Sequence, residues 1–159
     1  MNEENPTLGQ FVTALVHEAT GTNKIDETIL LLLVYLCDWH SCVKFNQRVV
    51  DVGWKVFCRG LADDGLETYI RASPDEFQID DLKQEIVCLK DPPTMLPDRV
   101  KSVIERVSSL YRAHRHSGLA TFALSTFPIL SSSATALEDV DLLLKAQEYA
   151  QIKMAEKTE

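Results

Sequence analysis

The sequence lacks a hydrophobic run long enough to cross a membrane. Its longest apolar stretch, residues 29–36, is far shorter than the roughly 20 residues that a spanning helix needs. The chain opens Met-Asn-Glu-Glu-Asn, without the basic and apolar segments of a secretory signal peptide. From these two absences we expect a soluble, cytoplasmic protein with no membrane partner.

Basic residues are also scarce. The 16 Lys and Arg residues face 24 Asp and Glu residues, which gives a formal net charge of −8. A domain whose main task is to bind phosphate backbones needs a net basic face. The composition therefore argues against nucleic acid as the principal partner.

Cysteines are few, at positions 37, 42, 58 and 88, and three of them lie inside apolar runs. Without a signal peptide, an oxidising compartment is not expected. The sequence therefore predicts free, mostly buried thiols.

Catalytic signatures are missing as well. The six glycines are scattered, so no phosphate-binding loop is present, and no nucleophile elbow or kinase motif occurs. Cys37, Asp38, His40 and Cys42 lie close together, but on a helix Cys37 and His40 can meet whereas Asp38 and Cys42 point away from them. A zinc site needs four converging ligands. We therefore expect a protein that is not an enzyme and has no metal or cofactor.

Hydrophobic periodicity predicts a single domain over residues 1–159 of mostly α (α+β) class, with about six helices around a buried central helix. The predicted helices span residues 8–20, 24–44, 61–70, 98–112, 117–125 and 136–154. The second of them is apolar around most of its circumference, as in a helix buried on several sides.

The same pattern predicts a small antiparallel sheet. Residues 49–57 alternate between apolar and polar side chains, as in a half-buried strand. Two short apolar runs, residues 77–79 and 86–89, predict a hairpin that pairs with this strand.

Helices 98–112 and 117–125 have the proportions of a helix-turn-helix motif, with several Arg and His residues nearby. The second helix offers almost no side chain that can read base edges. A DNA-linked autoregulator is therefore an alternative, and packing is the favoured role for these helices.

The order of segments resembles the Panacea domain, the SocA-like family of bacterial and phage antitoxins and proteolysis adaptors. The resemblance covers roughly residues 25–130. It is carried by the central motif Leu33-Val34-Tyr35-Leu36-Cys37-Asp38-Trp39-His40, the strand entry at residues 46–51, the hairpin at 77–89, the long helix at 96–111 and the segment at 117–126. Two family motifs differ here: residues 57–62 replace a Tyr-Gly-Pro-Val-Pro turn, and residues 125–128 replace a Thr-His pair.

The resemblance implies a non-enzymatic antitoxin or adaptor that binds a toxin or a protease client. Tryptophans are frequent anchors of protein interfaces, and one follows an acidic residue on the central helix while another lies in the strand. The expected partner-binding residues are Asp38, Trp39, His40, Trp54 and Arg59. A phage or prophage structural or host-interaction protein with the same fold is a further alternative, and the sequence also allows a homodimer.

Overall fold

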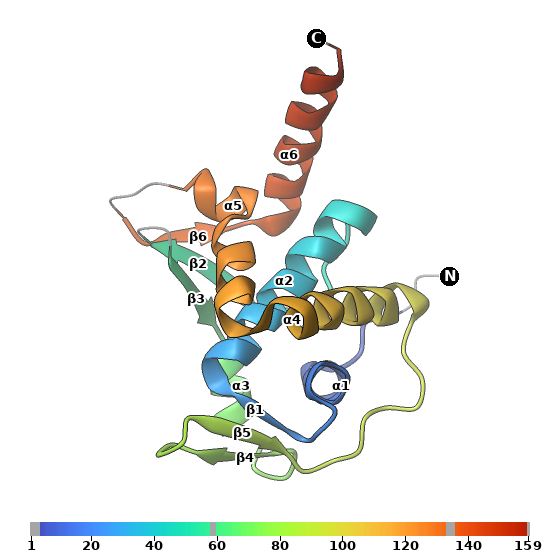
Figure 1. Cartoon of the computed structure of the whole chain (residues 1–159), viewed down its shortest axis with the longest axis vertical. Coiled ribbons are helices and arrows are strands. Elements are labelled where there is room, and N and C mark those ends of the chain that lie inside the picture. The colour runs from blue at the N-terminus through green and yellow to red at the C-terminus, as the bar shows by residue number, and fades with distance from the viewer. Residues whose placement is uncertain (1–3, 58–59, 133–135, 159) are drawn as a thin grey trace.

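The fold is described from a computed structural model, in which residues 4–57, 60–132 and 136–158 are placed (Figure 1). Within these ranges the chain forms six helices and six short strands, so the mostly helical α+β class is confirmed. The helices are α1 (Leu8–Thr20), α2 (Glu27–Phe45), α3 (Leu66–Arg71), α4 (Asp98–Leu124), α5 (Phe127–Leu130) and α6 (Leu142–Lys157). The strands are β1 (Lys24–Asp26), β2 (Gly53–Phe57), β3 (Gly60–Asp64), β4 (Phe77–Asp80), β5 (Glu85–Cys88) and β6 (Glu138–Val140).

Helix α2 runs through the centre of the molecule, as the sequence predicts (Figure 1). It packs against α4, α6 and α1. Every residue from Leu32 to Trp39 is buried, so all sides of the helix are covered over about two turns. By length and composition α2 would also be able to span a membrane, but 61 % of its most apolar window is buried inside the protein. These are the properties of the core helix of a globular fold.

Helix α2 begins at Glu27, three residues later than the sequence predicts. The Asp26 carboxylate accepts hydrogen bonds from the backbone N–H groups two and three residues later, at 2.8 and 3.1 Å, and so caps the helix. Asn23, which directly precedes the predicted start, instead donates from its side chain to the carbonyl of Cys88. Residues 24–26 then pair with another strand as β1, which prevents an earlier helix start.

The first sheet has the antiparallel order β1–β5–β4. It contains the predicted hairpin, which is confirmed as β4 and β5. The predicted pairing of that hairpin with strand 49–57 is wrong, because β5 pairs with β1 in the register Ile25↔Ile86. Both isoleucines are buried, so this pairing places two apolar side chains in the core.

The second sheet has the antiparallel order β3–β2–β6. Its central strand β2 is the predicted strand in a shorter form, and it buries Trp54 and Val56. Residues 60–64 pair with β2 as β3, so the helix predicted from residue 61 begins only at Leu66. Residues 138–140 pair with the other edge of β2, so the last helix begins at Leu142 instead of residue 136.

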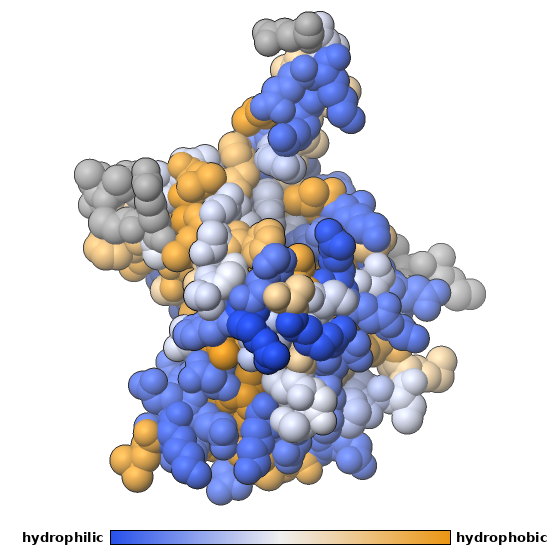
Figure 2. All heavy atoms as spheres, in the orientation of Figure 1, coloured by the Kyte–Doolittle hydropathy of each residue, from blue (hydrophilic) through white to orange (hydrophobic). Residues whose placement is uncertain are grey.

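The last helix is packed over only part of its length. Leu142 and Ala146 are buried, whereas all residues from 150 to 158 are exposed. Figure 1 shows this end of α6 projecting from the body of the protein. On the face shown in Figure 2, hydrophilic residues dominate around α4, and apolar residues gather where α5 and the β2–β6 pair lie.

The two predicted helices at 98–112 and 117–125 meet end to end across a bend in α4. Arg115 forms this bend, with φ 59° and ψ −163°. Residues other than glycine rarely adopt this backbone conformation, which costs of the order of 1–3 kcal/mol. Gly118 permits the close approach at the bend, because a Cβ there would lie 2.5 Å from the Cβ of His114.

Replacing Arg115 by glycine should therefore stabilise the protein. We expect Arg115→Gly to raise the free energy of unfolding by about 1 kcal/mol, measured by urea denaturation, because glycine adopts the left-handed conformation without steric cost. Arg115→Ala is the control, since it removes the same side chain but keeps the strain. If the glycine variant is no more stable than the alanine variant, residue 115 does not have this conformation in solution.

Candidate functional site

The most connected polar group in the core is the carboxylate of Asp38, whose side chain is completely buried. It accepts hydrogen bonds from Nε of Arg48 at 3.0 Å, from the backbone N–H of Val49 at 3.1 Å and from Nε1 of Trp54 at 2.9 Å. The Arg48 guanidinium also forms an ion pair with it. A buried carboxylate with this many donors has its polar atoms satisfied and stabilises the fold.

The structure places the predicted tryptophans in the core as well. Trp54 is 1 % exposed, and its ring packs edge-on against Tyr35 with 5.4 Å between the ring centroids. Trp39 is 8 % exposed and contacts Tyr149 of α6 in a similar way, at 5.9 Å. Neither Asp38 nor Trp54 is reachable from solvent in this fold, and Trp39 is almost inaccessible, which gives no support to a partner contact; their partner role stays a prediction.

The remaining predicted residues have different outcomes. His40 is half-buried, and its pKa is lowered by burial and by the nearby positive charges of Lys44 and Arg106. A partner role for His40 stays a prediction. Arg59 lies outside the described residues, so its role also stays a prediction.

Loss of the Asp38 carboxylate should destabilise the protein severely. We expect Asp38→Ala to lower the free energy of unfolding by about 3 kcal/mol, because it removes the acceptor of the buried N–H groups of Val49 and Trp54 and the carboxylate that pairs with the Arg48 guanidinium. Asp91→Ala, at an exposed position, is the control and should change stability by no more than about 0.5 kcal/mol. Urea denaturation measures both. Equal effects of the two substitutions would contradict the structural role of Asp38.

Three of the four cysteines lie in the described part of the chain, and all three are free and buried, as predicted. Burial raises the pKa of Cys42 to about 12 and that of Cys88 to about 11. The pKa of Cys37 is also raised, by burial and then by the charge of Asp38. Thiolates, not thiols, are nucleophiles and metal ligands. These cysteines therefore have no activated thiolate at neutral pH; Cys58 lies outside the described residues.

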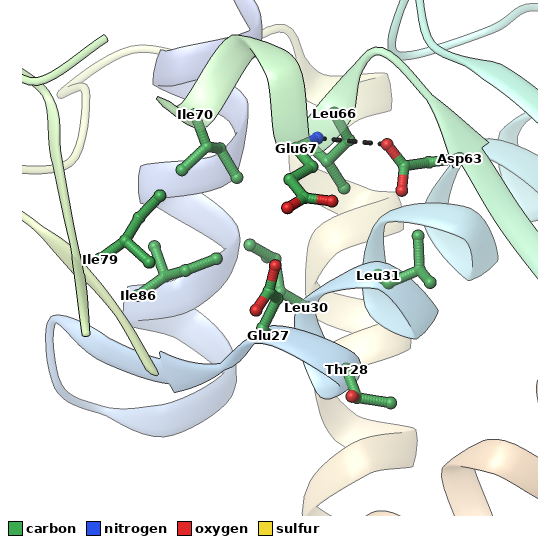
Figure 3. Close-up of a pocket in the computed structure, with 10 residues that line it drawn as sticks. All are labelled: Glu27, Thr28, Leu30, Leu31, Asp63, Leu66, Glu67, Ile70, Ile79 and Ile86. Carbon is green, nitrogen blue, oxygen red and sulfur yellow. Dashed lines mark hydrogen bonds between the residues drawn. The ribbon is translucent and has the colours of Figure 1, made fainter. Parts of the chain in front are cut away.

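A surface cleft of about 220 Å³ lies between the start of α2, the short helix α3 and the first sheet (Figure 3). We name it the α2/α3 cleft. Its apolar lining comes from four elements and consists only of aliphatic side chains: Leu30 and Leu31 of α2, Leu66 and Ile70 of α3, Ile79 of β4 and Ile86 of β5. Thr28 completes the uncharged part of the lining.

Three carboxylates belong to the same cleft, those of Glu27, Asp63 and Glu67. Figure 3 shows the carboxyl groups of Glu27 and Glu67 pointing toward its middle, one from α2 and one from α3. Asp63 accepts a hydrogen bond from the backbone N–H of Glu67 at 3.1 Å and so caps the start of α3. Glu67 accepts from Arg71 at 2.9 Å. Among the described residues that line the cleft, none is basic.

The cleft was not predicted from the sequence. Its residues come from positions 27–31, 63–70, 79 and 86, which no local motif connects. In the sequence, only the apolar helical spacing of Leu66 and Ile70 indicates a part of the cleft. The position of Asp63 depends on β3, which the sequence did not predict.

No protein-family model, curated protein or solved structure matches this chain. The cleft is therefore interpreted from its geometry alone. Within residues 4–57, 60–132 and 136–158, no group of three His, Cys, Asp or Glu side chains is arranged to hold a metal ion. The three carboxylates of the cleft therefore do not form such a group.

Proposed function

We propose that this chain is a non-enzymatic protein-binding module whose α2/α3 cleft receives a side chain of a partner protein. The composition of the cleft supports this proposal, because an aliphatic cavity with a few polar groups at its mouth is typical of a binding site. Its volume of about 220 Å³ is below the range of roughly 300–1,000 Å³ usual for small-molecule pockets. A cavity of this size suits one anchoring side chain of a protein interface.

The resemblance to the Panacea domain suggests which class of partner the protein binds. We propose that the partner is a toxin-like protein or a protease client. The chain would act by direct binding, either by covering the active surface of the partner or by delivering the partner to a protease. The net charge of −8 supports a basic partner, because complementary charge raises the rate of association.

A substitution that fills the cleft with a larger side chain tests this protein-binding function. The tagged wild-type protein should capture a specific partner from cells of the native host, and Ile79→Trp should reduce the captured amount at least about tenfold by occupying the cavity. Leu82→Trp is the matched control, since Leu82 is 99 % exposed and lies away from the cleft in the β4–β5 turn. Circular dichroism confirms that both variants fold.

Three results would count against the proposal. Absence of any specific partner contradicts the protein-binding function itself. Equal capture by the wild-type protein and a folded Ile79→Trp variant contradicts the cleft as the site. Equal loss in Ile79→Trp and Leu82→Trp also contradicts it, because the effect would then not depend on the cavity.

The basic residues at the bend of α4 favour a second candidate, a DNA-linked autoregulator. Arg112, His114, Arg115 and His116 are all exposed there. The helical segment after the bend buries Leu119 and Ala123 against the core, so that face is unavailable to a DNA groove.

An electrophoretic shift at low salt tests this candidate with the promoter of the chain's own gene. Binding by an autoregulator should retard the promoter fragment, and Arg112→Ala should weaken the retardation and its dependence on salt, because each phosphate contact releases counterions. Lys157→Ala, which removes a distant positive charge, is the control. An unshifted fragment at low salt would exclude the autoregulator.

A further inference from the structure

We propose that the occupant of the α2/α3 cleft is a cationic side chain, a lysine or an arginine, of the partner protein. This inference rests on the proposed function and names the chemistry of the group that the cleft binds. Its basis is the combination, in one cavity, of a wholly aliphatic floor with carboxylates contributed by three separate elements.

The floor matches the stem of such a side chain. Leu30, Ile70 and Ile86 are at most 3 % exposed and form a fixed aliphatic surface behind the opening. Lysine and arginine carry three or four methylene groups before the charged head, and these stems pack readily on apolar surfaces while the head remains near water. A cavity of about 220 Å³ has room for one such side chain.

The carboxylates of the cleft match the charged head of a lysine or arginine side chain. The carboxyl groups of Glu27 and Glu67 point toward the middle of the cleft (Figure 3). Asp63 uses Oδ2 to cap α3 and Glu67 uses Oε1 to bind Arg71, so each has a second oxygen for a further donor. An ammonium or guanidinium group would make charge-assisted hydrogen bonds to these oxygens, which are stronger than neutral ones.

A purely apolar occupant fits the cleft less well. It would displace water from the half-buried carboxylate of Glu27 without supplying a donor in return, which costs free energy. The Glu27 carboxylate has no hydrogen-bond or ion-pair partner within the described part of the chain, so solvent solvates it in the unbound protein. An acidic occupant would be repelled by all three carboxylates.

A metal ion is also a poor occupant. The carboxylates come from α2, β3 and α3 and do not form a group that could coordinate one ion in the described part of the chain. A cationic side chain does not need such convergence, because an ammonium or guanidinium group donates several hydrogen bonds in different directions.

Short peptides test the chemistry of the occupant without knowledge of the partner. The probes are alanine-based pentapeptides with blocked ends and lysine, arginine, norleucine or citrulline at the centre. Norleucine keeps the four-carbon stem of lysine but lacks the ammonium group, and citrulline has the size of arginine without its charge. Amide shifts in NMR spectra of the full-length protein report binding at residues 27–31 and 66–70. We expect the lysine and arginine peptides to bind at least about fivefold more tightly than their neutral counterparts, and this preference should decline between about 20 mM and 500 mM salt.

Two triple variants of equal net charge separate the effect of the cleft carboxylates from the effect of the overall charge of the protein. The triple variant Glu27→Gln/Asp63→Asn/Glu67→Gln should lose the preference for the basic peptides, while asparagine at 63 still offers an oxygen to cap α3. The control Asp91→Asn/Glu105→Gln/Glu156→Gln removes three exposed carboxylates elsewhere and should keep the preference.

The outcomes distinguish this inference from the function on which it rests. Equal or tighter binding of the norleucine peptide, no shifts at the cleft with any peptide, or an equal loss in both triple variants would overturn the cationic occupant. None of these results contradicts the protein-binding function if the wild-type protein captures a partner and Ile79→Trp blocks that capture. Failure of capture would instead overturn the function.

Discussion

The hydrogen bonds of the buried Asp38 carboxylate hold the rest of the structure in place. They join the central helix α2 to Arg48 and Val49 in the following loop and to Trp54 in β2. Since β3 and β6 both pair with β2, the position of the whole second sheet depends on this one group. The loss of any donor would leave a buried charge less well satisfied, so breaking this network is expected to be strongly destabilising.

The shape of the α2/α3 cleft also depends on the hydrogen bonds of Asp38. Asp63 lies in β3, whose position is fixed by pairing with β2, and Asp63 caps the helix that supplies Leu66 and Ile70. The opposite wall comes from the first turns of α2, ahead of its fully buried segment. Helix α2 thus serves two purposes along its length, with its start at the surface forming part of the cleft and its middle forming the core.

The sequence of the central motif gave two opposing indications, and the structure shows how deeply the motif is buried. Trp39, next to Asp38, is a residue type that often anchors interfaces, whereas the apolar residues around the pair indicate burial. Burial prevailed, because Arg48 and Trp54 supply the donors that an interior carboxylate requires. Both of these donors follow Asp38 within 16 positions, yet nothing in the local pattern specifies that they turn back toward it.

The sequence by itself determined the features that repeat locally: the apolar periodicity of α1, α2 and α4, the β4–β5 hairpin, the buried thiols at positions 37, 42 and 88 and the mostly helical class. Only the tertiary structure decided the partners of the short strands and the existence of the α2/α3 cleft. Strands of three residues, such as β1 and β6, are too short to show a period of two, and their pairing is chosen by which apolar faces can be buried together. The cleft exists because those long-range pairings bring four separate segments around one space.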